Sequence, residues 1–374
     1  MIYLDNGATS MPKPRTVVDS VTWAMKNLAS PSRGSSRMAK NAEDVLYHLR
    51  QEAGEMFHCP MEHVVLTTSA THGLNIAIKS MVRPGQRVVV SCMEHNAVVR
   101  PLHALGVDLQ IARAELFDSE GLVESFDKLL TKDTALCVMT HVSNVFGWIL
   151  PVEEVAALCR KRGIPFILDA SQSAGMLEVD MEKLGAAFVA MPGHKGLLGP
   201  QGTGLLLCRE WSVPLLEGGT GSQSKLLEMP DFLPDRLEAG THNMPGAAGL
   251  LAGIRYVKTR GIHNIHRHEV ILKELAAKEL EIIRDLKVFA AGNQTGVLSV
   301  LPLNRDPVVL GEVLAEKYQM ALRSGLHCAP FAHEAAETLG TGTIRISFGP
   351  FNTREDCKYL LRAFKKELQN MKES

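Results

Sequence analysis

The amino-acid sequence predicts an α/β fold, with a mostly parallel, doubly wound sheet in a large domain and a smaller α+β domain after it. The short apolar runs up to about residue 210 are continuously apolar rather than alternating, as in strands that are buried on both faces. Helical patterns lie between these runs, which is typical of parallel sheets. After about residue 250 the pattern changes to longer, charged helical stretches.

The strands of the large domain are predicted from runs of apolar, often β-branched residues that are flanked by turn residues. A helix is expected over 70–81, directly after the first strand, and another over 152–162 that ends at Gly163. A Pro-Gly turn precedes the second strand. The expected strands cover 63–68, 87–91, 135–140, 165–169, 186–191 and 203–208.

The rest of the chain has a different pattern. A long, charged helical stretch is expected from about 246 to 284. Before it, residues 217–245 are rich in Gly, Pro, Ser and Thr and are expected to form a long loop, which in a compact protein is usually functional. The remaining elements are strands over 296–301 and 343–348, a helix near 307–319 and a closing helix over about 353–371.

Composition excludes several classes of protein. The chain has 374 residues, and 40 Lys and Arg against 41 Asp and Glu give a formal net charge of −1, whereas nucleic-acid binding needs a basic surplus. The first residues do not resemble a signal peptide, and no apolar run approaches the roughly 18 residues of a membrane helix. Seven cysteines, no two within four residues of each other, favour neither a disulfide framework nor a cysteine-based zinc site. A reducing cytoplasm is therefore expected.

Polar or titratable residues follow several consecutive expected strands, at the edge where open α/β sheets bind ligands. Residues 69–73 open a helix there, and they either cap it or bind an anion. Lys195 on a Gly-rich loop and Asp169 suit pyridoxal phosphate, which needs a lysine for a Schiff base, an acid beside the ring nitrogen and a phosphate cup. Gly196 follows Lys195 where a P-loop has Ser or Thr, and no strand is followed by Gly-x-Gly-x-x-Gly, so other phosphate-binding loops are excluded.

Short segments along nearly the whole chain carry a resemblance to a known family. They lie at 3–9, 68–71, 94–96, 141–147, 169–172, 193–195, 199–202, 236–241, 323–330 and 345–347. In this order they resemble the cysteine desulfurase and selenocysteine lyase family, within the class V aminotransferase group of fold-type I pyridoxal-phosphate enzymes. The resemblance implies a large cofactor domain over 15–250 and a small domain made of 1–14 and 251–374.

The resemblance also implies roles for residues around the cofactor ring. Lys195 would form the Schiff base, and Asp169 would keep the ring nitrogen protonated. His95 would stack on the ring and shuttle protons. Asn144 and Gln172 would lie beside the phenolic oxygen or the substrate.

For the cofactor phosphate, the resemblance implies the backbone of Ala70 and the side chains of Thr71 and His194. The loop that contains Thr220 would reach the phosphate from the other subunit of a homodimer. One position departs from the family pattern, because Pro192 stands where a Ser or Thr hydroxyl usually donates to the phosphate.

For the substrate, the resemblance implies that Arg345 binds the carboxylate through its two-pronged guanidinium. Arg323 and His327 would support the loop of Cys328 and contact the substrate. A lone cysteine is most often buried and inert, but positive charge near Cys328 would favour the thiolate, which is the nucleophile. The inert interpretation is kept for Cys59, Cys92, Cys137, Cys159, Cys208 and Cys357.

The implied reaction is pyridoxal-phosphate-dependent removal of sulfur or selenium from L-cysteine or L-selenocysteine, which gives L-alanine and passes the sulfur to Cys328 or releases selenium. An acceptor protein would then take the sulfur or selenium. Two alternatives stay open: another class V aminotransferase or β-lyase, and a non-catalytic sulfur-carrier scaffold. The histidines at 263, 266 and 268 are interpreted as a solvated helix surface, and no metal site is expected.

Overall fold

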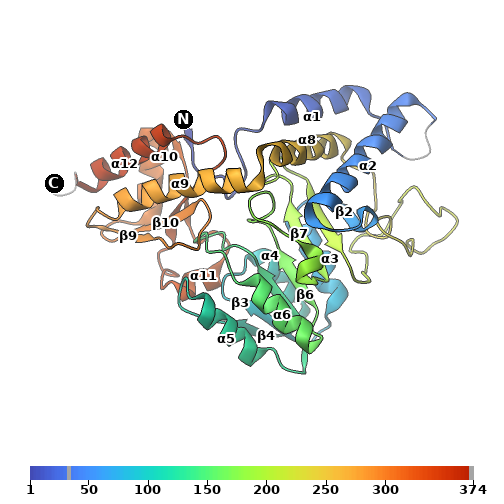
Figure 1. The fold of residues 1–374 in the computed structure, drawn as a ribbon, viewed down its shortest axis with the longest axis horizontal. Helices are drawn as coiled ribbons and strands as arrows, with labels where there is room; N and C mark the ends of the chain where they lie inside the picture. The colour runs from blue at the N-terminus through green and yellow to red at the C-terminus, as the bar shows by residue number, and fades with distance from the viewer. Residues whose placement is uncertain (32–34, 370–374) are drawn as a thin grey trace.

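The computed structural model describes residues 1–31 and 35–369. A larger sheet lies in the middle of an elongated molecule, and a smaller sheet lies towards one end of it (Figure 1). The larger sheet carries helices on both faces, and the smaller sheet packs against α9, α10 and α12 near the two chain termini. The long helix α9 (Ile262–Leu280) runs between the two parts and follows α8 (Met244–Arg260), which lies beside α1 and α2 (Figure 1).

Among the described residues, the large sheet has seven strands in the order β2-β8-β7-β6-β5-β3-β4. The five strands from β7 to β4 are parallel, and β8 is antiparallel to both β2 and β7. The predicted α/β class and the six expected strands are therefore confirmed. The strands are β2 (Val64–Thr67), β3 (Arg87–Ser91), β4 (Asp108–Ala112), β5 (Thr134–Thr140), β6 (Phe166–Asp169), β7 (Phe188–Pro192) and β8 (Gly204–Cys208).

Helices cover both faces of this sheet because alternate residues of each strand point to opposite sides. In β7, Phe188 and Ala190 join a core with α3 and α4, whereas Val189 and Met191 join a second core with α2, α5, α6 and α8. All four side chains are fully buried, which explains why the strand is continuously apolar in the sequence. The helices are α1 (Arg15–Asn27), α2 (Arg37–Phe57), α3 (Ala70–Met81), α4 (Asn96–Leu105), α5 (Ser119–Leu129), α6 (Val152–Arg162) and α7 (Met181–Leu184).

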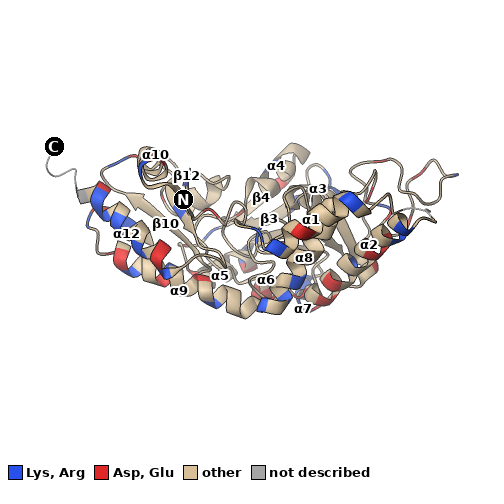
Figure 2. Cartoon of the chain, turned by 90° about the horizontal axis from the view of Figure 1, so that it is seen from above, with Lys and Arg blue, Asp and Glu red and all other residues tan. Residues whose placement is uncertain are grey.

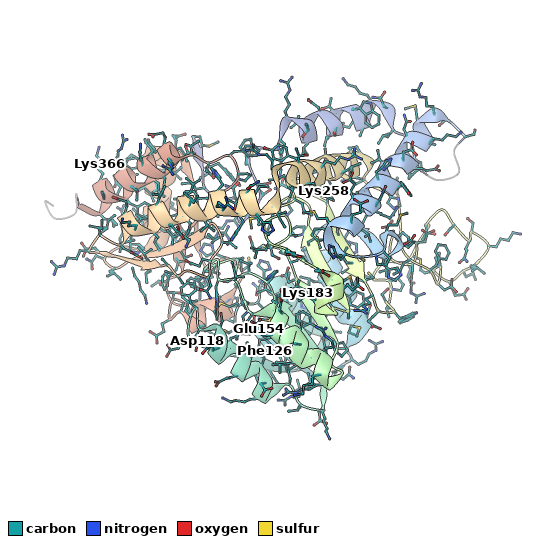
Figure 3. The ribbon with its side chains drawn as sticks, in the orientation of Figure 1. Asp118, Phe126, Glu154, Lys183, Lys258 and Lys366 are labelled. Carbon is teal, nitrogen blue, oxygen red and sulfur yellow. The ribbon has the colours of Figure 1, made fainter. Side chains whose placement is uncertain are left out.

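Side chains fix individual helices in place. Asp118 caps α5 by accepting a hydrogen bond from Gly121 N at 2.9 Å, and Phe126 of the same helix is fully buried where α5 packs near α6 (Figure 3). Lys258 of α8 pairs with Glu52 of α2 at 2.6 Å (Figure 3). Figure 2 shows that Lys, Arg, Asp and Glu gather on outer helices such as α12, which agrees with a sheet that is buried on both faces.

The C-terminal part has an antiparallel sheet of its own, with described strands in the order β12-β13-β10-β9. A short parallel pair joins β1 (Ile2–Tyr3) at the N-terminus to β11 (Met320–Ala321). This places the first residues of the chain against the C-terminal part. The other elements are β9 (Leu286–Phe289), β10 (Val297–Pro302), α10 (Pro307–Tyr318), β12 (Arg323–Gly325), α11 (Pro330–Ala335), β13 (Thr343–Ser347) and α12 (Arg354–Gln369).

Two expectations about elements need correction. The stretch expected as one helix over 246–284 is two helices, because Gly261 between them has φ +80°, which no helix continues through. The sequence patterns also missed α1, α2, α4, α5, β4 and β9. The last residues of the expected closing helix, 370–371, lie outside the described residues.

The long loop is confirmed, since 209–243 contain neither helix nor strand among the described residues. In the described chain no helix is long and apolar enough to cross a membrane.

Candidate active site at the carboxyl edge of the large sheet

The predicted site residues gather where β3, β5, β6 and β7 end. His95 follows β3, Asn144 follows β5, Asp169 is the last residue of β6 and Lys195 lies just beyond β7. Because these strands are parallel, their ends lie at one edge of the sheet. Within the described residues, no three His, Cys, Asp or Glu side chains are grouped so that they could hold a metal ion.

The start of α3 offers free N–H groups to an anion. Ser69 caps the helix by accepting a hydrogen bond from His72 N at 3.2 Å. The described chain supplies no acceptor for the backbone N–H groups of Ala70 and Thr71. Such groups at a helix N-terminus bind phosphate. The residues therefore fit the anionic end of pyridoxal phosphate.

His194 is the second group that fits a phosphate. Its Nδ1 is buried and has no hydrogen-bond partner among the described residues. Burial, Lys195 and Lys13 lower the pKa of His194 to about 4, so the ring is neutral and can donate a single hydrogen bond. Pro192 ends β7 and has no N–H or hydroxyl to donate.

Lys195 combines a cationic side chain with surroundings that disfavour its charge. Burial is the largest cause that lowers its pKa, to about 8, with Arg345 and Arg323 acting in the same direction. Asp169 opposes this shift. A lysine with such a pKa exists partly as the free amine near neutral pH, which is the form that forms Schiff bases and takes up protons.

Asp169 and His95 are held by backbone groups. Ser171 N donates to Asp169 Oδ1 at 2.9 Å, and Asp169 itself is buried. Ala97 N donates to His95 Nδ1 at 3.0 Å, so the neutral ring carries its proton on Nε2. Burial lowers the pKa of His95, which keeps the ring neutral.

Glu94 lies under this site, although the sequence assigned no role to it. It is fully buried, and Oε1 accepts hydrogen bonds from Ser91 Oγ and from Thr140 N. Burial, supported by the nearby Asp169, raises the pKa of Glu94 to about 8. Glu94 therefore joins the ends of β3 and β5 as a neutral acid. Its position directly before His95 in a matched segment was the available signal.

The loop of Cys328 is tied to the same edge of the sheet. Asn96 N donates to the Cys328 carbonyl at 2.7 Å, and Asn144 Nδ2 donates to the His327 carbonyl at 2.7 Å. His327 and Cys328 have φ values of 49° and 59°, in the left-handed region that few non-glycine residues adopt. Cys328 is exposed, whereas the six other cysteines are buried.

His327 differs from the expectation that it brings positive charge to Cys328. Burial is the main cause that lowers its pKa to about 2, and Arg345 and His333 act in the same direction. The ring is therefore neutral. Of the two expected cationic neighbours, Arg323 remains, and its side chain is half exposed.

Arg345 is held by a partner that the sequence analysis did not identify. Its side chain is 3% exposed, and one terminal nitrogen binds Asp5 Oδ1 at 2.6 Å. The other terminal nitrogen donates to the Asn144 carbonyl at 3.0 Å. Asp5 Oδ2 also binds Arg323 at 3.2 Å, so one carboxylate joins two guanidinium groups. The buried Nε of Arg345 has no partner among the described residues.

Two other predicted residues lie in different surroundings. Gln172 is buried and donates from Nε2 to the Gly7 carbonyl at 2.9 Å. Thr220 lies in the long loop, where its hydroxyl contacts Ser222 Oγ at 3.1 Å. It lines a cavity of about 570 Å³ together with Arg50, Glu238 and other residues. Lys195 is not among the described residues that line this cavity.

Comparisons with known proteins extend these observations to nearly the whole chain. The model of the family described as aminotransferase class-V matches residues 2–360. A protein of Methanothermobacter thermautotrophicus named probable cysteine desulfurase is 33% identical over 96% of this chain and 92% of its own length. A cysteine desulfurase of Escherichia coli O8 is 30% identical over the same shares of the two chains. The apo structure of a cysteine desulfurase from Thermococcus onnurineus has a TM-score of 0.89 and 29% identity, and it covers 99% of this chain and 95% of that one.

Proposed function

The chain belongs to the aminotransferase class-V family, and on that premise we propose that it is a pyridoxal-phosphate-dependent cysteine desulfurase. It removes sulfur from L-cysteine, releases L-alanine and leaves a persulfide on Cys328. The relatives named cysteine desulfurase match this chain over nearly its whole length, which supports the proposal.

One observation carries the proposal. An exposed thiol, Cys328, sits on a loop that Asn96 and Asn144 bond to the sheet edge where Lys195 lies. An aminotransferase or a β-lyase has no use for a thiol at that place, because neither reaction transfers sulfur to the protein. The persulfide reaction requires both a lysine and a nucleophilic cysteine.

Several of the groups that would hold the cofactor have no hydrogen-bond partner among the described residues. The N–H groups of Ala70 and Thr71 and the His194 ring would bind the phosphate, and Lys195 would form the Schiff base. Asp169 would pair with the ring nitrogen, His95 would cover the ring, and Asn144 and Gln172 would lie beside it. When bound, pyridoxal phosphate supplies an electron sink for the carbanion at the substrate Cα.

The chain's own residues do the remaining work. Arg345 binds the substrate carboxylate and orients the Cα–H bond towards Lys195, with Arg323 and His327 supporting the substrate and the Cys328 loop. The Lys195 amine takes the Cα proton. The Cys328 thiolate then attacks the substrate sulfur, so that an S–S bond forms as the C–S bond breaks, and the electron pair left on carbon takes up a proton. Cysteine and the Cys328 thiol become alanine and the Cys328 persulfide.

The proposal extends to assembly and partners. Thr220 is proposed to reach the cofactor phosphate of a second subunit in a homodimer, because the cavity that it lines within its own chain does not include Lys195. An acceptor protein is proposed to take the sulfur from the exposed Cys328. Activity on L-selenocysteine and a cytoplasmic location stay predictions from the sequence.

The test is a reaction of the purified holoenzyme with L-cysteine. Alanine release is measured together with the mass of the peptide that contains Cys328, in wild type, Lys195→Ala and Cys328→Ala. Wild type should gain one sulfur atom on Cys328. Lys195→Ala should lose the visible absorbance of the bound cofactor and fall at least about a hundredfold in alanine release.

Cys328→Ala keeps the visible absorbance and loses alanine release in the same assay. Cys357→Ala is the matched control, because that thiol is buried in the small domain, and its alanine release should equal wild type. Pyruvate and free sulfide without alanine would identify a β-lyase. A colourless wild-type protein with no turnover would identify a scaffold, and either result overturns the proposal.

A further inference from the structure

A small cavity lies next to Lys195 and Gln172, and α9 contributes Glu269 to its wall. Its volume is about 30 Å³, enough for one water molecule. Lys195, Gln172, Asn6 and Glu269 are among the residues that line it, whereas Asp169 is not among those described there.

The neutral polar side chains around this cavity already have partners. Asn6 Nδ2 donates to the Ser347 carbonyl at 3.0 Å, and Gln172 Nε2 donates to the Gly7 carbonyl at 2.9 Å. Two titratable groups remain. Neither the Lys195 ammonium nor the Glu269 carboxyl has a hydrogen-bond partner within residues 1–31 and 35–369.

Glu269 is an unusual residue to leave without a partner. It lies on α9 and is 2% exposed. Its side chain packs on the backbone of Gly296, where an added Cβ would lie 2.6 Å from the Glu269 Cβ. Burial raises the pKa of Glu269 well above its usual value, which favours the protonated acid. A buried carboxylic acid without a protein partner is costly unless water satisfies it.

The other charged groups near Glu269 are engaged elsewhere. Lys273, one turn later on α9, donates to the Ala291 carbonyl at 3.1 Å. His268 Nε2 bonds with the Asn352 carbonyl at 2.9 Å. Lys195 is therefore the titratable group that shares the cavity with Glu269.

We propose that Glu269 stores a proton that Lys195 exchanges through a water molecule in this cavity. The Glu269 carboxyl gives its proton to the water, and the water gives a proton to the Lys195 amine. The reverse transfer restores the acid. Glu269 acts through Lys195 and does not touch the substrate, so it is a positioning residue. The inference rests on the proposed function only in using Lys195 as the base at the substrate Cα.

The store would matter because Lys195 must both take and return protons while the substrate fills the site. The carbon that loses sulfur needs a proton, and so does Cα before alanine leaves. A buried acid behind the lysine supplies one proton without opening the site to solvent.

The test uses L-alanine in D₂O, since alanine has no sulfur to lose and still exposes its Cα proton to Lys195. Exchange of that proton is followed by NMR with the holoenzyme. Glu269→Gln keeps the size of the side chain and cannot transfer a proton, so exchange should slow at least about tenfold. Glu269→Asp keeps the acid on a side chain that is one methylene shorter, and it should slow exchange less than Glu269→Gln does. Glu274→Gln, at an exposed position of the same helix, should exchange at the wild-type rate.

Two further measurements separate proton storage from a structural effect. The melting temperature and the visible cofactor absorbance of Glu269→Gln should match wild type. The infrared difference spectrum between wild-type and Glu269→Gln apo-protein at neutral pH should contain the C=O stretch of a protonated acid. The proposal would be overturned if Glu269→Gln and Glu269→Asp, or whichever of the two folds, exchanged the Cα proton at the wild-type rate. A carboxylate band in place of the acid band in the infrared difference spectrum would also overturn it. Desulfuration can fail independently, because none of these measurements uses cysteine.

Discussion

At the residue scale, burial decides which groups at the site are charged. His194 and His327 are neutral because their pKa values are lowered to about 4 and about 2, mainly by burial. Glu94 is neutral because its pKa is raised to about 8. Lys195, with a pKa of about 8, titrates near neutral pH. The site thus combines neutral hydrogen-bonding groups with a lysine that titrates near neutral pH.

Glu94 should make the stability of the protein depend on pH. Below its usual pKa of 4.5 the carboxyl is protonated in both the folded and the unfolded chain. As pH rises from there to about 8, the unfolded chain releases a proton that the folded chain keeps, so stability falls. Glu94→Gln removes this effect, and its Oε1 can still accept from Ser91 and Thr140. Relative to wild type, the variant should gain about 1–3 kcal/mol between about pH 5 and about pH 8.

Urea denaturation of wild type and Glu94→Gln at the two pH values checks this expectation. A difference between the two proteins that stays constant with pH would show that Glu94 is ionised in the folded state.

At the element scale, the turn after β6 and the loop after β7 are packed backbone against backbone. Gly175 has φ +89°, and an added Cβ would lie 2.4 Å from the Gly196 carbonyl oxygen. Because Gly196 directly follows Lys195 in the chain, this close approach fixes the position of the Lys195 backbone. A side chain at position 175 would have to move that loop.

Gly175→Ala should therefore destabilise the protein more than a glycine replacement without a collision. Gly163→Ala is the matched control, since Gly163 has φ +66° at the end of α6 and no described atom lies within 4 Å of its added Cβ. Both variants place a side chain at a positive φ. The collision should cost Gly175→Ala at least about 2 kcal/mol more, measured by urea denaturation. Equal midpoints would show that the loop adjusts freely.

At the scale of the whole molecule, Asp5 joins three distant parts of the chain. It lies in the N-terminal segment, it binds Arg345 of β13 and Arg323 of β12, and Arg345 in turn binds the carbonyl of Asn144 after β5. The small sheet is thereby tied to the carboxyl edge of the large sheet. This connection sets the distance between the proposed carboxylate-binding arginine and Lys195.

Asp5→Asn should weaken that connection, because the buried Arg345 guanidinium loses its charged partner. We expect a loss of about 3 kcal/mol in the free energy of unfolding and a higher KM for cysteine. Arg323→Gln is the control for stability, since its half-exposed ion pair with Asp5 should be worth less than about 1 kcal/mol. Denaturant titration measures both. Equal losses would mean that Asp5 does not hold Arg345 in place.

Local sequence patterns predicted the strands best where both faces of the sheet are covered. The strands over 135–140 and 186–191 were found because burial on both faces makes a strand continuously apolar. β4 was missed because it is the edge strand, and only its last residue is fully buried. α1 and α2 were missed because their apolar stripes are narrow and their exposed faces are polar.

The sequence by itself determined the α/β class, the positions of the central strands along the chain and the motifs that contain Lys195, Asp169 and Cys328. These follow from local patterns and short motifs, which do not depend on distant contacts. Only the tertiary structure decided that His327 is neutral, that Asp5 holds Arg345, and that Glu269 shares a cavity with Lys195. The physical reason is that burial and charge pairing depend on residues hundreds of positions apart, whose approach no local pattern records.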